Sequence, residues 1–308
     1  MECKRPQRCA YSSRDWVNSM QMQNIDKTIQ KLPSLSVFFP AYNEEGNIEA
    51  VLNQALSVLP QVANKFEVIV VDDGSTDATL HFARKTAERY NAKNGESSGD
   101  ADPLVRVIHQ ENKGYGGAVK RGLAEARFEW VFFSDADRQF DLSELKNFIQ
   151  HTQTNDLVIG YRKNRAEGWK RRMLAVALKI WNKIFLGFPL RIKDIDCAFK
   201  LIHRRVLDEV LPLLSDGAMV STELLFKAHR LGFAYRQIGV NHYERVEGSS
   251  TGSNPLVIAQ AVIDTFSLRK KLTIEPTVVR LTNAFVHDIH DPWLGLRVFA
   301  RWFRLQMS

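Results

Sequence analysis

The sequence is poor in cysteine, and its three cysteines form no recognisable pattern. Cys3, Cys9 and Cys197 are spread over 308 residues, and the first two lie in a polar N-terminal segment. This spacing matches neither a disulfide framework nor a zinc site. We therefore expect the chain to work in a reducing compartment.

Long apolar runs are also missing. The first thirty residues carry charges throughout, so the sequence predicts no secretory signal peptide. The most apolar stretch is residues 173–188, which is shorter than the roughly 20 residues needed to cross a bilayer. It also contains Lys179, Asn182 and Lys183. The sequence therefore predicts no transmembrane helix in this stretch.

Charge of one sign is in modest excess. Lysine and arginine number 42 against 35 aspartates and glutamates, which gives a net charge of +7. Such a surplus suits an anionic partner, such as nucleic acid, a nucleotide diphosphate or an acidic membrane surface. No recognised nucleic-acid-binding motif accompanies the charge, so we expect no nucleic-acid partner. The oligomeric state cannot be read from the sequence.

Apolar runs alternate with helical patterns from residue 35 to about residue 160, which predicts an α/β domain with a mostly parallel sheet flanked by helices. The predicted strands are residues 35–40, 66–71, 104–109, 130–135 and 233–242, with a strand or loop at 195–202. The predicted helices are residues 48–59, 76–90, 117–126, 169–186, 203–214 and 221–231, and Pro60 is expected to end the first. Asp141 and Glu144 have the spacing of a capping box.

Three regions follow from this pattern. We expect an N-terminal extension at residues 1–33, a compact α/β domain at residues 34–252 and a C-terminal helical appendage at residues 253–308. In open α/β sheets, ligands bind beyond the carboxyl ends of the strands. Polar clusters stand at three such ends, at residues 41–45, 72–77 and 134–139.

The cluster at 134–139 predicts a cation site. Asp135 and Asp137 stand two residues apart at a strand end, and Gln139 adds a neutral oxygen. Mg²⁺ and Mn²⁺ prefer oxygen ligands and keep positions open for phosphate oxygens. The alternative is a solvated turn with acidic caps.

Two further loops could contact a nucleotide. Asp72 and Asp73 precede Gly74, and a carboxylate there could accept from a base N–H or a ribose hydroxyl; plain turn chemistry would need only one Asp. Lys113 lies in the glycine-rich stretch 112–117, which opens a helix and could approach a phosphate or ribose. Its spacing fits neither a P-loop nor a Rossmann fingerprint.

Two basic segments bear on location. Residues 161–172 are rich in lysine and arginine and directly precede the apolar stretch 173–188, which suits an anionic lipid head group or an ordinary solvated face. Near the C-terminus, Arg297, Arg301 and Arg304 share one helical face beside aromatic residues. That helix could lie in a membrane interface, or it could pack in a core or dimer. We expect a cytoplasmic protein with peripheral contact at the inner face of a membrane.

Together these motifs resemble the inverting glycosyltransferases of family 2, most closely the branch that transfers sugars to dolichyl and polyprenyl phosphates. The resemblance covers about residues 34–252. The pieces that carry it, in order, are FPAYNEEGNI, VVDDGSTDAT, NKGYGGAVKRG, SDADRQF, LVIGYR, GWKRR, DIDCAFKLIHRRVL, STELLFKAHRLGF and HYERVEGSS. It implies a GT-A fold, the fold of nucleotide-diphospho-sugar transferases.

The resemblance also implies roles for single residues. Those lining the nucleoside pocket would be Pro40, Tyr42, Glu44 and Asp72, and those holding Mg²⁺ or Mn²⁺ and the diphosphate would be Asp135, Asp137 and Gln139. Basic positions that face phosphates match Arg162, Arg171 and Arg172, and those of later motifs match Lys200 and Arg245. The chain departs from the branch at Phe140–Leu142, where relatives are often Pro-rich, and at Ala175, where they often have Ser. These departures bear on the acceptor more than on the donor.

The expected reaction is a direct displacement at the anomeric carbon of a nucleotide-diphospho-sugar, with Asp137 and Arg172 as catalytic candidates. The expected acceptor is a polyprenyl phosphate, which is already ionised and needs no protein base. A hydroxyl acceptor would need a carboxylate base, for which Glu223 and Asp196 are candidates. Glu223 could instead favour the start of a helix. A non-catalytic module that binds nucleotide sugars or nucleic acid is a further alternative.

Overall fold

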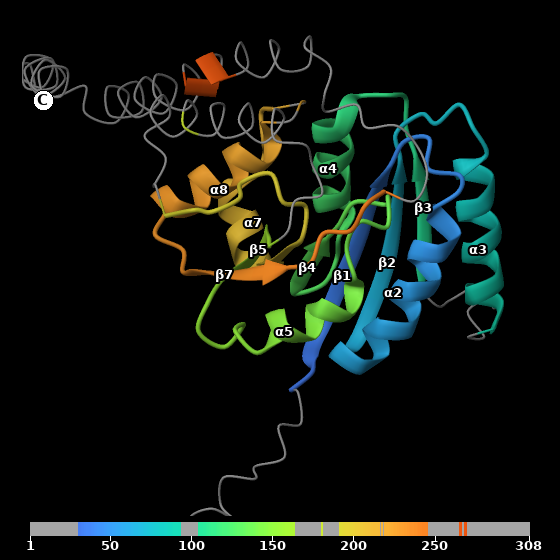
Figure 1. Cartoon of the computed structure of the whole chain (residues 1–308), viewed down its shortest axis with the longest axis horizontal. Coiled ribbons are helices and arrows are strands. Elements are labelled where there is room, and N and C mark those ends of the chain that lie inside the picture. The colour runs from blue at the N-terminus through green and yellow to red at the C-terminus, as the bar shows by residue number, and fades with distance from the viewer. Residues whose placement is uncertain are drawn as a thin grey trace, which may run out of the picture.

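The computed structural model describes residues 30–93, 104–163, 180, 191–215, 217, 219–245, 265–266 and 268–269. Seven strands in these residues form one sheet (Figure 1). They are β1 (Leu32–Ala41), β2 (Ala63–Asp72), β3 (Val105–His109), β4 (Trp130–Phe133), β5 (Leu157–Arg162), β6 (Lys200–His203) and β7 (Tyr235–Val240). The sheet order is β3-β2-β1-β4-β6-β5-β7.

Most neighbouring strands run parallel, as the alternating pattern predicts. Strand β3 runs parallel to β2, β2 to β1, and β1 to β4, and β5 runs parallel to β7. Strand β6 is the exception, because it lies antiparallel between β4 and β5. The predicted mostly parallel α/β sheet is therefore confirmed, with one reversed strand that the sequence did not reveal.

Helices cover the sheet over its whole width. They are α2 (Ile48–Val62), α3 (Thr79–Lys93), α4 (Gly114–Glu125), α5 (Leu145–Ile149), α7 (Arg204–Val210) and α8 (Val220–Arg230), with a 3₁₀ turn η1 (Leu142–Glu144) before α5. Figure 1 shows α2 and α3 against the β1–β3 half of the sheet, and α7 and α8 beside the β5–β7 half.

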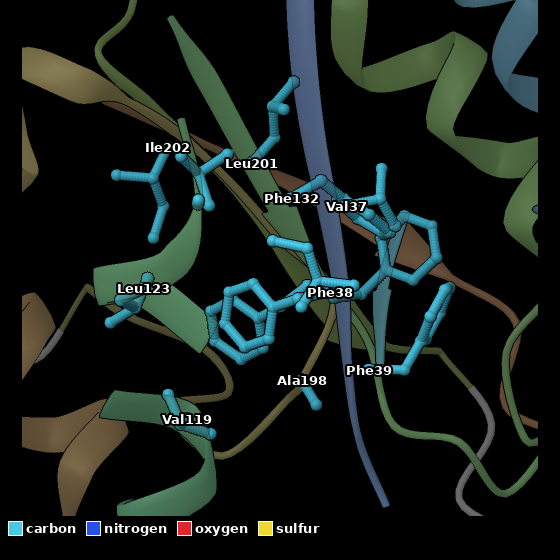
Figure 2. Close-up of a cluster of buried hydrophobic side chains, with 14 of the residues drawn as sticks. Val37, Phe38, Phe39, Val119, Leu123, Phe132, Ala198, Leu201 and Ile202 are labelled. Carbon is cyan, nitrogen blue, oxygen red and sulfur yellow. The ribbon is translucent and has the colours of Figure 1, made fainter. Parts of the chain in front are cut away.

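The core lies between β1 and the helices on its two sides. Residues 35–41 of β1 are all buried, which explains why this strand reads as a continuous apolar run. Phe38 and Phe39 point to opposite sides of β1, and Phe38 lies on the side of Val119 and Leu123 from α4 (Figure 2). The Phe38 ring also stacks on Phe133 of β4, with 5.1 Å between ring centroids.

The limits of several elements differ from the sequence-based prediction. Pro60 does not end the first helix, since α2 continues to Val62 with Pro60 inside it. Only two helical residues follow Pro60, so its missing N–H removes a single hydrogen bond of the last turn. Strand β4 ends at Phe133, two residues before the predicted end, so Asp135 lies in the loop beyond the sheet.

The capping box is only half formed. The Asp141 carboxylate accepts from the Ser143 amide, as an N-cap should, but the Glu144 carboxylate accepts from the Asn241 amide. The predicted helix at 169–186, apart from residue 180, and most of the predicted appendage at 253–308 lie outside the described residues, as does the extension before residue 30. The three-region division remains a prediction.

Candidate nucleotide and cation site

The site is built where parallel strands end side by side. Ala41 of β1 stands beside Asp72 of β2, and Asp72 stands beside His109 of β3. The Asp73 amide donates to the Ala41 carbonyl at 2.9 Å, and the Gln110 amide donates to the Asp72 carbonyl at 3.0 Å. The chain segments leaving these strands therefore start from one shared edge, as their parallel order requires.

Hydrogen bonds join the loop after β1 to the loop after β2. The Asn43 amide donates to the Ser75 hydroxyl at 3.0 Å, and the Asn43 side-chain oxygen accepts from the Thr76 amide at 2.8 Å. Glu45 accepts from the Ala78 amide at 2.9 Å. These contacts use the first residues after Gly74, so α3 begins at Thr79 rather than at residue 76 as predicted.

Asp73 fixes the glycine-rich loop. Its Oδ1 accepts from the Gln110 side-chain amide at 2.7 Å and from the Lys113 backbone amide at 2.9 Å. Gly74 has φ of +73°, and a Cβ there would lie 2.8 Å from the Asn112 backbone nitrogen. Turn chemistry therefore accounts for Asp73 and Gly74, and it leaves Asp72 available for another purpose.

Asp72 is fully buried and only half satisfied. One carboxylate oxygen, Oδ2, lies 2.6 Å from Nδ1 of His109. The other, Oδ1, is buried and has no hydrogen-bond partner among the described residues. A buried carboxylate oxygen without a donor is costly, so it indicates a place where a ligand supplies one.

The other predicted nucleoside-pocket residues behave differently from one another. Pro40 is buried in β1 beside Val71, whereas the Tyr42 ring is 44% exposed one residue beyond the strand. The Glu44 carboxylate accepts from the Asn47 side chain at 2.7 Å and from Arg245 at 3.3 Å. Glu44 thus contacts the cation side of the site.

Asp135 and Asp137 are close enough to disturb each other's charge. Burial and the neighbouring Asp137 carboxylate together raise the pKa of Asp135 to about 7, although a hydrogen bond from the Tyr115 hydroxyl and the Lys200 charge act to lower it. Burial and the Asp135 charge raise the pKa of Tyr115 well above its usual value. A divalent cation between the two carboxylates would relieve this repulsion.

Arg245 neutralises this end of the site. Its Nη2 donates to Oδ2 of Asp137 at 2.7 Å, and its Nη1 donates to Oε1 of Glu44 at 3.3 Å. The other Asp137 oxygen accepts from the Gln139 amide at 3.1 Å. Arg245 therefore connects the loop after β1 with the loop after β4.

Gln139 is held through its amide nitrogen. Its Nε2 donates to the Tyr243 carbonyl at 2.9 Å, and the Tyr243 amide donates back to the Gln139 carbonyl at the same distance. The side-chain oxygen is therefore the Gln139 atom that could face a cation.

The donor set fits a hard divalent cation. Within the described residues no three His, Cys, Asp or Glu side chains are grouped as a complete metal site. Two carboxylates and an amide oxygen suit Mg²⁺ or Mn²⁺, which usually retain water and take phosphate oxygens from a substrate. The fit is thus to a cation whose coordination a diphosphate completes.

Two basic residues of the predicted site, Arg162 and Lys200, are already engaged by protein groups. Arg162, at the end of β5, pairs with both oxygens of Asp194, through Nε at 2.8 Å and Nη2 at 3.0 Å. Lys200 is fully buried, donates to the Cys197 carbonyl and to the Ser221 hydroxyl, and lies over the Phe133 ring. Burial lowers the pKa of Lys200, against the nearby acidic side chains that raise it.

Glu223 is placed as a structural residue. It is fully buried in the first turn of α8, where its oxygens accept from the amides of Leu214 and Ser215 and pair with Lys227 at 2.8 Å. Burial raises its pKa, but these hydrogen bonds outweigh burial and lower it. The arrangement favours a structural role over the predicted base: Glu223 lies in the first turn of α8, but its backbone partners belong to the loop before the helix and not to the helix start.

The remaining predicted residues are less informative. Arg171 and Arg172 lie outside the described residues. Lys113 is exposed and contributes its backbone amide, as described for Asp73. Sequence reasoning gave no role to His109, whose signal was its place at a strand end.

Asp194, which holds Arg162, was also given no role by sequence reasoning, although it is the first residue of the DIDCAFK motif.

In the part of the chain that the structure describes, no helix is long and apolar enough to cross a membrane.

Comparisons with known proteins identify the family of the chain. The family model for glycosyl transferase family 2 matches residues 36–211. The dolichyl-phosphate beta-glucosyltransferase of Saccharomyces cerevisiae is 30% identical over 260 residues, which cover 78% of this chain and 73% of that protein. The protein of the same name from Homo sapiens is 32% identical over 233 residues, covering 70% of this chain and 68% of that protein.

A bacterial relative and a solved structure extend the comparison. The undecaprenyl-phosphate 4-deoxy-4-formamido-L-arabinose transferase of Aeromonas hydrophila is 28% identical over 218 residues, covering 70% of this chain and 62% of that protein. The glucosyl-3-phosphoglycerate synthase of Mycobacterium tuberculosis, solved with Mn²⁺, UDP and glucosyl-3-phosphoglycerate, superposes with a TM-score of 0.57 at 24% identity. That match covers 77% of this chain and 80% of the synthase chain. The fold is accordingly of the GT-A type, and the chain is a glycosyltransferase that belongs to family 2.

Proposed function

We propose that this glycosyltransferase uses Mg²⁺ or Mn²⁺ to transfer a sugar, with inversion, from a nucleotide-diphospho-sugar to a polyprenyl phosphate at a membrane surface. The observation that carries the proposal is the meeting of Asp135, Asp137 and Arg245 at the sheet edge that also holds Asp72. The names of the relatives, which act on dolichyl and undecaprenyl phosphates, support the acceptor class.

The donor would lie along the ends of β1, β2 and β4. Its base would reach the half-satisfied Asp72 and lie against the exposed Tyr42 ring, since aromatic faces stack on bases. Its diphosphate would reach Asp135, Asp137 and Gln139 through the cation. When bound, the cation supplies electrostatic stabilisation of the charge that develops on the departing diphosphate.

Basic residues of the chain would add to the stabilisation of the departing diphosphate. Arg245 touches Asp137, so it stands within reach of a group bound there. Lys200 is fully buried, so it would act on the donor indirectly, through the effect of its charge on Asp135. Arg162 keeps its orientation through Asp194, which leaves Nη1 to donate elsewhere. Positioned cations of this kind stabilise a leaving group without rearranging.

The class of acceptor decides whether a carboxylate base is needed. A phosphate monoester has a second pKa of about 6, so it attacks as an anion without giving up a proton to the protein. A hydroxyl acceptor would need a base, and Glu223 has its oxygens committed to backbone amides and Lys227. This occupancy argues against Glu223 as a base but leaves Asp196, the other candidate, which is exposed near Arg162 and Lys200. The choice of a phosphate acceptor therefore rests mainly on the relatives' names.

A matched pair of acceptors tests the proposal. Vesicles would carry either a polyprenyl phosphate or the corresponding polyprenol, and radiolabelled nucleotide sugars with Mn²⁺ would be supplied as donors. We expect label to enter the phosphate-bearing lipid only, and Asp137→Asn or EDTA to abolish transfer. Equal labelling of the polyprenol would contradict the acceptor, and full transfer in the presence of EDTA would contradict the cation.

A further inference from the structure

His109 lies in the candidate site, and its imidazole ring has been given no role so far. It is the last residue of β3 and stands directly beside Asp72 in the sheet. Its side chain is 45% exposed, whereas the Asp72 side chain is fully buried. The two meet through Nδ1 of His109 and Oδ2 of Asp72 at 2.6 Å.

The chemistry of the pair fixes which atom donates. An ionised carboxylate can only accept hydrogen bonds, so Nδ1 of His109 must carry the proton that lies between them. This bond occupies Oδ2 and holds the carboxylate in one orientation. The second oxygen, Oδ1, then remains buried without a donor among the described residues.

The backbone around Asp72 cannot supply the missing donor. The Asp73 amide, next along the chain, donates to the Ala41 carbonyl, and the Gln110 amide, from the neighbouring strand end, donates to the Asp72 carbonyl. The Gln110 side chain is committed to Asp73. Oδ1 of Asp72 is therefore the atom that could accept a hydrogen bond from an N–H or O–H group of a ligand.

We infer that His109 is a positioning residue that holds Asp72 so that Oδ1 receives a ring N–H of the donor's base. The inference rests on the proposed function and names the class of base it requires. Uracil carries N3–H and guanine carries N1–H, whereas cytosine and adenine present an unprotonated ring nitrogen at the same place. A fixed carboxylate oxygen attracts the first pair and repels the second.

Nearly isosteric ligands make the test direct. Dissociation constants would be measured by calorimetry for UDP against CDP and for GDP against ADP, each with Mn²⁺. The wild-type chain should bind one member of the N–H class, UDP or GDP, at least about tenfold more tightly than its partner lacking the ring N–H, because hydrogen bonds to charged groups contribute about 1.5–3 kcal/mol. The two pairs distinguish a uracil pocket from a guanine pocket.

Two substitutions of His109 separate positioning from packing. His109→Ala removes the Nδ1 donor, and we expect it to reduce the base preference to within about twofold. The melting temperature should fall as well, because Oδ2 of the buried Asp72 loses its donor, so the ratio of affinities is the readout and not stability. In His109→Asn the side-chain amide nitrogen can occupy the place of Nδ1, so this variant should restore most of the preference. A residue that merely supported the fold would lower all four affinities alike.

The outcomes separate this inference from the proposed function. An unchanged preference in His109→Ala, or no recovery in His109→Asn, would overturn the positioning role. Tight binding of all four nucleotides by the wild-type chain would overturn the base class while leaving the transferase intact. Failure of every nucleotide to bind the wild-type chain would contradict both.

Discussion

At the scale of single residues, aspartates that are close neighbours in the sequence have different roles in the site. Asp72 and Asp73 are adjacent, yet Asp73 fastens the loop at Gln110 and Lys113 while Asp72 keeps one buried oxygen unpaired. Asp137 and Asp135 also differ, because Asp137 is paired with Arg245 whereas Asp135 is opposed by Asp137. Position in the fold, rather than residue type, decides which carboxylate can take a ligand.

Arg245 should compete with a metal ion for Asp137. Without nucleotide, we expect Arg245→Gln to raise the affinity for Mn²⁺ about tenfold, because the substitution frees Oδ2 of Asp137 from a charged hydrogen bond. Binding of free Mn²⁺ would be followed by electron paramagnetic resonance. The readout is independent of transfer activity.

Arg138→Gln is the matched control for that measurement. Arg138 is exposed and adjoins Asp137 in the chain, so its loss removes the same charge from the same neighbourhood. It should raise Mn²⁺ affinity much less than Arg245→Gln does. Equal effects of the two substitutions would show that only the general field of the surface changes, and would contradict the competition.

The limits of sequence reasoning are clearest for residues whose role depends on a distant partner. Asp135 and Asp137 could be singled out because they share one strand end. Glu223 could not be judged from sequence, because its partners Leu214 and Ser215 come from the loop that precedes α8. His109 was visible only as the end of a strand, since its meaning depends on Asp72 across 37 residues.

At the scale of elements, close packing of α4 on β1 holds the glycine-rich loop in place. Gly122 of α4 lies against the Phe38 ring, and a Cβ at this position would lie 2.2 Å from Phe38 Cδ2. The glycine is therefore needed for the helix to approach the strand. The same helix begins at Gly114, directly after the loop that Asp73 holds.

Gly122→Ala should destabilise the protein even though alanine favours helices. Because the new methyl group would lie against the buried Phe38 ring, we expect an overpacking cost of about 2–3 kcal/mol. After a helix-propensity gain of about 1 kcal/mol, the free energy of unfolding should fall by about 1–2 kcal/mol. Urea denaturation would measure the change. Glu88→Ala, on the exposed side of α3, should alter stability by less than about 0.5 kcal/mol. A Gly122→Ala variant at least as stable as the wild type would contradict the packing.

The positions of the buried parallel strands could be predicted from the sequence, but the direction of the antiparallel strand β6 could not. Strands β1, β2 and β4 are apolar along most of their length because both faces are covered, so their position could be predicted within a few residues. Strand β6 has only four residues, and nothing in KLIH indicates that it inserts antiparallel between β4 and β5. Its place is set by pairing with strands far along the chain.

At the scale of the whole molecule, one sheet edge collects segments from across the described chain. Loops after β1, β2, β3 and β4 meet there, and Arg245, from beyond β7, reaches the loops after β1 and β4. The predicted GT-A fold is confirmed, and with it the common edge of these loops. Peripheral contact with a membrane stays a prediction, because the segments that suggest it lie outside the described residues.

The central claim is that two carboxylates form an incomplete cation site that a nucleotide diphosphate completes. Calorimetric titration of UDP and GDP, with and without Mn²⁺, tests this claim most directly. We predict that Mn²⁺ tightens binding of the preferred nucleotide at least about tenfold, a coupling of about 1.4 kcal/mol, and that Asp137→Asn removes this gain. The account would be contradicted by a nucleotide affinity that is the same with and without Mn²⁺, or by an undiminished gain in Asp137→Asn.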